Sequence, residues 1–166
     1  MVNKINVTPG TAVIFADAGF VGEDVEISLT SLGDTIGRLS ARHDLGATTR
    51  AARITVFGEF QAVATPTLGD IIAVYAAWHD EAGNAMGGVG TVDAALTQDK
   101  ARNLDYVGAA IADAAAADTI FTMGPKILET KGRYLSLGVI NDAASALTAD
   151  DAENFLYVYP WALEIQ

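Results

Sequence analysis

Two short clusters of histidine and acid are the residues best suited to metal chemistry in this sequence. One is His43–Asp44 and the other is His79–Asp80–Glu81. Imidazole and carboxylate groups together bind several divalent ions. However, consecutive residues of an extended chain point to opposite sides, so neither cluster can chelate an ion as a unit without a turn. The spacing therefore indicates solvated loop ends, and we expect no metal site.

Other kinds of chemistry have no better support in the residue types. The glycines of GNAMGGVG, residues 83–90, are followed by TVDAALT and lack the lysine of a phosphate-binding loop. The chain has no cysteine, no G-x-S-x-G motif and only two histidines, so no nucleophile with its base is recognisable. Asp150 and Asp151 are adjacent acids in a polar segment, which are usually solvated. We therefore predict that the protein is not an enzyme and needs no cofactor.

Four arginines form the most distinctive charge pattern. Arg38, Arg42, Arg50 and Arg53 lie close together in a chain with only ten basic residues. Arginines at alternate outward positions of a strand can simply keep a sheet face hydrated. Alternatively, they form a cationic patch that docks on an acidic protein surface, where arginine is favoured for its bidentate geometry. Both interpretations stay open, and the four arginines are candidate protein-interface residues.

The overall composition limits the kind of partner and the compartment. Ten Lys and Arg against 21 Asp and Glu give a net charge of −11, which repels nucleic-acid phosphates and anionic lipid. We therefore expect a protein or sugar partner, with no nucleic acid and no membrane. The start MVNKINVTPG lacks the apolar core of a secretory signal, so we expect synthesis in the cytoplasm. The 166 residues are predicted to form one domain, 1–166, with residues 1–11 as a candidate N-terminal arm.

Alternation of apolar and polar residues is the dominant periodicity of the chain. In VEISLTS, residues 25–31, every second residue is apolar, which predicts a strand with one buried face. RITVFGEFQAV, residues 53–63, repeats this pattern, with Gly58 as a candidate bulge. ATPTLGD then predicts a turn that joins this strand in a hairpin to residues 71–78, IIAVYAAW. Because residues 71–78 are apolar on both faces, we expect them to form a central strand.

The remaining segments complete a prediction of an all-β fold. RYLSLGVIN, residues 133–141, is a further strand, and weaker candidates are 12–16, 37–45, 104–111 and 119–123. About eight short strands separated by turn residues predict a single-domain β-sandwich, and we favour a jelly roll. The alanine-rich segment 108–118 suits a helix, but it lacks a wide apolar stripe, so strand followed by loop is predicted. Thr148 and Asp151 have capping-box spacing, which indicates one helical turn.

The C-terminal stretch FLYVYPWALEIQ, residues 155–166, holds four of the thirteen aromatic residues. In a strand, its odd-numbered residues, which include all four aromatics, share one side. This side can pack in the core or form an interface with a neighbouring subunit. We favour the core, because an exposed stripe of large apolar residues is an aggregation hazard before assembly. Pro160 cannot donate a ladder hydrogen bond, so part of this strand is expected at an edge or a bulge.

Two stretches resemble small structural proteins of tailed bacteriophages. Residues 32–81 contain a DLG turn at 44–46, an arginine-bearing strand, the sequence PTLGD at 66–70, and a strand with YAAW at 75–78. GRYLSLGVINDAASAL at 132–147 and FLYVYPWALEIQ are similar to the closing strands of the same proteins. These motifs are patterns of strand and turn without catalytic residues, and segments 83–90 and 108–118 fall outside them.

The resemblance implies a jelly-roll virion protein, above all a capsid decoration or cement protein that binds the assembled head through protein–protein contacts. Its expected partners are the major capsid protein or other virion proteins. Its expected location is the virion, after assembly in the host cytoplasm, and we expect a homo-oligomer, with a trimer favoured. The alternatives are a phage tail or fibre component and a carbohydrate-binding β-sandwich, for which Trp78 and Trp161 are available.

Overall fold

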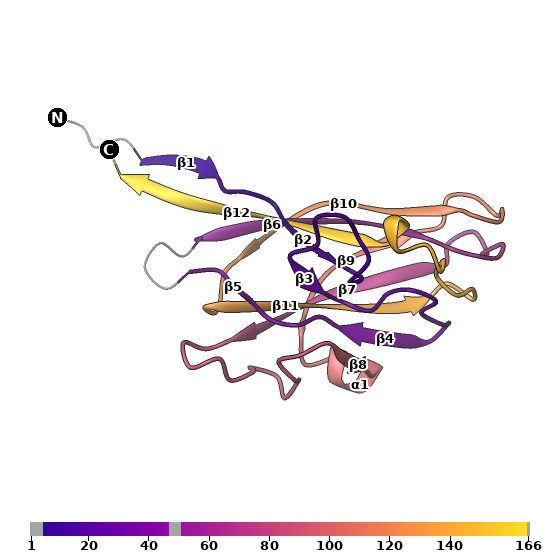
Figure 1. Cartoon of the computed structure of the whole chain (residues 1–166), viewed down its shortest axis with the longest axis horizontal. Helices are drawn as coiled ribbons and strands as arrows, with labels where there is room; N and C mark the ends of the chain where they lie inside the picture. The colour runs from indigo at the N-terminus through magenta and orange to yellow at the C-terminus, as the bar shows by residue number, and fades with distance from the viewer. Residues whose placement is uncertain (1–4, 47–50, 166) are drawn as a thin grey trace.

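The computed structural model describes residues 5–46 and 51–165, with side chains for residues 10–46 and 51–161. The structure is 47% strand and 5% helix, and two sheets pack against each other (Figure 1). The all-β sandwich that the alternation predicted is therefore confirmed, as is the low helix content. The two helices of the described residues are both short: α1 (Gln98–Ala101) and the 3-10 helix η1 (Asp151–Glu153).

Each sheet joins strands that are distant in the sequence. Sheet A has the order β10 (Ile120–Glu129), β6 (Arg53–Gln61), β12 (Phe155–Ile165), β2 (Val13–Ala16) and β3 (Val25–Glu26), with β1 (Ile5–Pro9) paired to β12. Sheet B has the order β8 (Ala94–Leu96), β4 (Ile36–Leu39), β11 (Tyr134–Asp142), β7 (Ile71–His79) and β9 (Asp105–Ile111), with β5 (His43–Asp44) beside β11. Paired strands are antiparallel, except that β2 and β3 are parallel.

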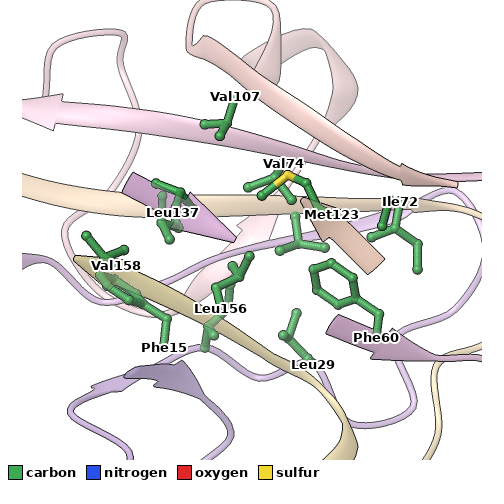
Figure 2. Close-up of a cluster of buried hydrophobic side chains, with 14 of the residues drawn as sticks. Phe15, Leu29, Phe60, Ile72, Val74, Val107, Met123, Leu137, Leu156 and Val158 are labelled. Carbon is green, nitrogen blue, oxygen red and sulfur yellow. The ribbon is translucent and has the colours of Figure 1, made fainter. Parts of the chain in front are cut away.

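The main core lies between the two sheets and follows the alternation in the sequence. In β6 every second residue from Ile54 to Phe60 is buried. The predicted inward residues of β11 are fully buried: Leu135, Leu137 and Val139. Figure 2 shows Phe15 and Leu156 of sheet A in the same layer as Val74 of sheet B. Each such side chain contributes about 1.5–3 kcal/mol on burial, so this layer is the main source of stability.

The segment after β6 crosses between the sheets, and here the predicted hairpin is wrong. β6 belongs to sheet A and β7 to sheet B, so residues 62–70 carry the chain from one layer to the other. The predicted central position of β7 is correct, because it lies between β11 and β9. An alternating pattern specifies which residues share a side, but it does not specify the partner strand. The turn residues alone could therefore not distinguish a hairpin from a crossing.

The VEISLTS segment has the predicted burial but little strand. Ile27 and Leu29 are fully buried, yet the strand β3 ends at Glu26. The backbone N–H groups of Leu29 and Thr30 donate to the Asp17 carboxylate, at 3.0 and 2.9 Å for Oδ2. Because a side chain takes these donors, the backbone here does not need a ladder partner.

Two local features of sheet A differ from expectation. Gly58 lies in regular register with Leu156 and is not a bulge. A Cβ atom on Gly58 would lie 2.5 Å from the Leu156 Cδ2 atom, so close packing between β6 and β12 requires the glycine. The bulge lies on β10, between Met123 and Lys126.

The two predictions for the weak helix signals are largely confirmed. The alanine-rich segment forms the end of β9, which stops at Ile111, and the residues that follow are irregular. A single turn, η1, does form near Thr148. However, its N-cap is Asp150, whose carboxylate accepts from the N–H of Ala152 at 3.0 Å, while the Thr148 hydroxyl oxygen accepts from the N–H of Asp150.

The outer face of sheet B is covered by the chain itself. Residues 80–104, which we name the cover segment, contain β8, which is itself the edge strand of sheet B, and α1. A second apolar cluster joins sheet B to this segment: Leu39, Ala77 and Ile140 from the sheet, and Val89, Leu96 and Ala101 from the cover segment. A Cβ atom on Gly138 would lie 2.6 Å from the Leu96 Cδ2 atom, so glycine lets the cover segment approach closely. The cover segment, which includes the glycine-rich residues 83–90, is therefore a packing element.

Candidate interaction face

The aromatic residues of β12 point away from the core, contrary to our prediction. Leu156 and Val158 are fully buried, whereas Phe155, Tyr157 and Tyr159 are only half-buried. Both sides of this strand are apolar, so alternation could not decide which side faces inward. The smaller aliphatic side chains fill the space between the sheets, and the larger aromatic ones lie on the outer face of sheet A.

Six aromatic residues meet on this outer face, which we name the aromatic face: Phe20, Phe57, Phe155, Tyr157, Tyr159 and Trp161. Phe57 of β6 stacks on Tyr157 at 4.9 Å and on Tyr159 at 6.0 Å between ring centroids. Phe155 lies edge-on to Tyr157 at 5.1 Å, and Phe20 lies 5.4 Å from Phe155. These five rings thus form one continuous row across three segments of the chain, and Trp161 lies on the same side of β12.

The row is anchored at the end that carries Trp161. The indole Nε1 of Trp161 donates to the Thr55 hydroxyl oxygen at 2.7 Å. Thr55 is in register with Tyr159 on one side and with Ile127 of β10 on the other. The Ile127 side chain is 69% exposed, so the apolar surface continues past the rings to the edge of the sheet.

Neither helix covers the aromatic face. α1 packs on sheet B through Ala101, and η1 has no buried residue. Phe20, from the loop after β2, reaches only the end of the row at Phe155. The charged residues at outward positions of β6, β10 and β12 are Arg53, Glu59 and Glu129. The face is therefore mainly apolar, with a small and mixed charge.

Two of the four predicted interface arginines bind within the chain. Arg38 is in register with the buried residue Val139 of β11 and with Ala95 of β8, so it points to the inner side of sheet B from its second strand. There it forms an ion pair with Asp93, whose carboxylate also accepts from the hydroxyl of Ser28. Arg42 donates to the Gly83 carbonyl oxygen at 2.8 Å. These contacts attach the loops to the sheet.

Arg53 does not join Arg38 and Arg42 in a patch. Arg53 lies on sheet A, 4.0 Å from Glu129, with a side chain that is 64% exposed. Arg50 lies outside the described residues. The structure therefore does not bring Arg38, Arg42 and Arg53 together, and Arg53 is the described member that remains available to a partner.

The histidines of the two candidate metal clusters are separate and largely buried. Burial is the main cause that lowers the pKa of His43 and that of His79. The His79 Nε2 atom lies 2.9 Å from the Ser136 hydroxyl oxygen. Among the residues that the structure describes, no three His, Asp or Glu side chains are grouped to hold a metal ion.

A small pocket of about 230 Å³ lies beside Trp78 and the cover segment. Trp78 is 4% exposed, and its indole N–H donates to the Asp105 carboxylate at 2.7 Å. Lys131 also binds this carboxylate, at 2.6 Å. Burial acts to raise the pKa of Asp105, but the hydrogen bonds from Lys131 and Trp78 hold it below its usual value. Trp78 thus belongs to the packed interior and offers no ring face to a ligand.

The sequence missed Phe20 and Phe57 as members of the aromatic face. Phe57 lies among outward polar residues of β6, and a large aromatic residue at such a position is the signal that could have identified it. Phe20 carries no such signal, because it lies in an irregular loop and reaches Phe155 only through the fold.

Comparisons with protein-family models, with curated proteins and with solved structures found no match for this chain. Among the described residues, no helix has the length and apolar character needed to cross a bilayer.

Proposed function

We propose that this chain is a structural virion protein of a tailed bacteriophage, and specifically a capsid decoration protein that binds the assembled head through protein–protein contacts. The observation that carries the proposal is the aromatic face, because a contiguous apolar surface on a folded domain is typical of a protein–protein contact site. Tyrosine and tryptophan are also the residue types most often found at the centre of such contacts. The resemblance of segments 32–81 and 132–147 to phage structural proteins is the reason for proposing that this contact occurs in a virion.

The strand pairing supports the jelly-roll part of the proposal. The eight strands β2, β4, β6, β7, β9, β10, β11 and β12 pair in a nested order: β2 with β12, β4 with β11, β6 with β10, and β7 with β9. In an eight-stranded jelly roll, the first strand pairs with the last, the second with the second-last, and so on inward. Viral capsid proteins use this fold. The short strands β1, β3, β5 and β8 are additions to this frame.

The buried polar residues support a structural role. Asn141 is fully buried, and its amide donates to the carbonyl oxygens of Leu32 and Ser145, each at 2.8 Å. Asp17 and Asp93 likewise hold loop backbone or loop side chains. These groups use their hydrogen bonds to fix loops to the sheets. Fixed loops are suited to a structural component of a particle.

The ring geometry favours protein over sugar as the partner. Phe57, Tyr157 and Tyr159 stack on each other with interplanar angles of 13–21°. These three rings contact one another with nearly parallel planes, so part of their surface is already taken up within the chain and is not open to a sugar. Of the two tryptophans available for sugar binding, Trp78 is buried, and the indole N–H of Trp161 already donates to the Thr55 hydroxyl oxygen.

Mass spectrometry of particles purified from a phage that encodes this chain tests the proposal. We expect a copy number comparable with that of the major capsid protein. A few copies per particle would instead support the tail or fibre alternative, and absence from purified particles would contradict a virion role altogether.

A further inference from the structure

We infer that the aromatic face is the surface through which this chain binds a second copy of itself. The inference rests on the proposed function and narrows it: on the assembled head, the aromatic face contacts a neighbouring copy of this chain, and the capsid protein is contacted by another part of the surface. Decoration proteins act in many copies, and closed symmetric assembly is the usual form of a homo-oligomer. The homo-oligomer that the resemblance implies thereby acquires a specific surface, with the two-fold contact of a dimer in place of the favoured trimer.

The charge distribution is the first argument for a second copy. The chain has a net charge of −11, so two copies repel each other over most of their surface. On the outward positions of β6, β10 and β12, one basic residue, Arg53, stands against two acidic residues, Glu59 and Glu129, which gives −1. This is a part of the surface where another acidic copy can approach closely.

The same residues make the face complementary to itself. Arg53 and Glu129 lie at one end of the face with side chains 64% and 81% exposed, and their own contact is long, at 4.0 Å. In a two-fold contact, a residue of one copy meets a different residue of the other, and the reverse contact is then repeated. Arg53 and Glu59 lie toward opposite ends of the outward row of β6, so a two-fold axis near the middle of that row would bring Arg53 of each copy to Glu59 of the other.

The ribbon formed by β1 and the end of β12 is the second argument. β6 follows β12 only as far as the pair Arg53 and Trp161, whereas β1 follows it from Trp161 to Ile165. Beyond Trp161, β12 therefore has β1 as its one partner among the described residues, and Figure 1 shows this ribbon projecting from the sandwich. A two-stranded ribbon alone is marginally stable in water, and free strand edges favour pairing with another chain.

The ribbon and the aromatic face meet at the same residue. Trp161 is both the last aromatic residue of the face and the first residue that pairs with β1. A second copy seated on the face is therefore placed next to the ribbon, where it can shield the ribbon and its edges as well. A single neighbouring copy would therefore cover both the aromatic face and the ribbon.

The test measures the oligomeric state by sedimentation velocity and native mass spectrometry over a wide range of protein concentration. Ile127→Glu adds a charge at a position that is 69% exposed, so the monomer should fold normally. The matched control is Ile111→Glu, on β9 of sheet B, where the isoleucine is 56% exposed. We expect an oligomer for the wild type and for Ile111→Glu, and a dissociation constant raised roughly tenfold or more for Ile127→Glu.

A wild-type chain that is monomeric at every concentration would overturn the inference, as would equal oligomerisation of the two variants. A second pair guards against local effects: Tyr159→Ser on the face and Tyr106→Ser on sheet B, where Tyr106 is 58% exposed. The particle assay separates this inference from the proposed function. If the chain is monomeric but still occurs on particles, only the self-association is contradicted. If the chain forms an oligomer but is absent from particles, only the virion role is contradicted.

Discussion

The outer faces of the two sheets are both rich in apolar residues, but within residues 5–46 and 51–165 the chain covers only one of them. On sheet B, Leu39 and Ile140 are 2% and 1% exposed, because the cover segment packs on them. On sheet A, Phe57, Tyr157 and Tyr159 remain half-buried, and no segment of the described part of the chain packs over them in this way. The cover segment shows that this fold can bury an outer face when burial serves stability alone. A large apolar face that stays uncovered therefore indicates a surface kept for a partner.

The largest expected difference between the two faces is in the stability of the monomer. Ile140→Ala removes a side chain between sheet B and the cover segment, and we expect a loss of about 2–5 kcal/mol in the free energy of unfolding. Ile127→Ala, on sheet A, should change it by less than about 0.5 kcal/mol. Urea denaturation at low protein concentration measures both. Equal losses would mean that the outer face of sheet A is covered in the folded monomer.

The arginines extend the comparison to charged residues. Arg38→Met leaves the largely buried Asp93 carboxylate without its cation, and we expect a loss of about 1–3 kcal/mol. Arg53→Met on sheet A should leave the unfolding transition unchanged, because the Arg53 side chain is largely exposed. Chemical denaturation of the two variants checks this. An Arg38→Met variant as stable as the wild type would show that the ion pair with Asp93 does not stabilise the fold, and Arg38 would then again be a candidate interface residue.

Ring stacking on the uncovered face is expected to give a smaller effect. A double-mutant cycle of Phe57→Leu and Tyr157→Leu should give a coupling energy of about 0.5–1.5 kcal/mol, since the two rings stack at 4.9 Å. The control cycle pairs Phe57→Leu with Tyr75→Leu, because Tyr75 lies on the other sheet. If the losses in the free energy of unfolding are additive in both cycles, Phe57 and Tyr157 are not energetically coupled in the monomer.

The effect of pH is expected to be the smallest, and it involves the covered face. His79 is fully buried on β7, next to the start of the cover segment. Because burial lowers its pKa from the ordinary value of 6.5, the unfolded chain binds a proton at a higher pH than the folded chain does. Its contribution to stability is therefore complete above pH 6.5 and is lost as the pH falls toward the folded-state pKa.

An NMR titration of the two histidine rings, together with denaturation at neutral and mildly acidic pH, tests this prediction. We expect the His79 ring to titrate below its ordinary pKa and the free energy of unfolding to decrease as the pH falls. A His79 ring that titrates at or above the ordinary value would show that the cover segment does not bury it in solution.

Much of the fold follows from the sequence, because side-chain alternation is a property of the local backbone. The buried side of β11, the buried residues of β6 and the central position of β7 all follow from period two and apolar content. The crossing at residues 62–70 does not, because a turn sequence contains no information on the sheet to which the next strand belongs.

The candidate site shows the same division. The sequence by itself determined that Phe155, Tyr157, Tyr159 and Trp161 share one side of a strand, because the pleat of an extended chain places alternate residues together. Which side faces the core was decided only by the tertiary structure, since Leu156 and Val158 offer an equally apolar alternative. The space between the sheets is lined by side chains from strands that are distant in the sequence, and the side chains of β12 that fill this space best are the ones that become buried. The aromatic rings, joined there by Phe20 and Phe57, were left on the outer surface.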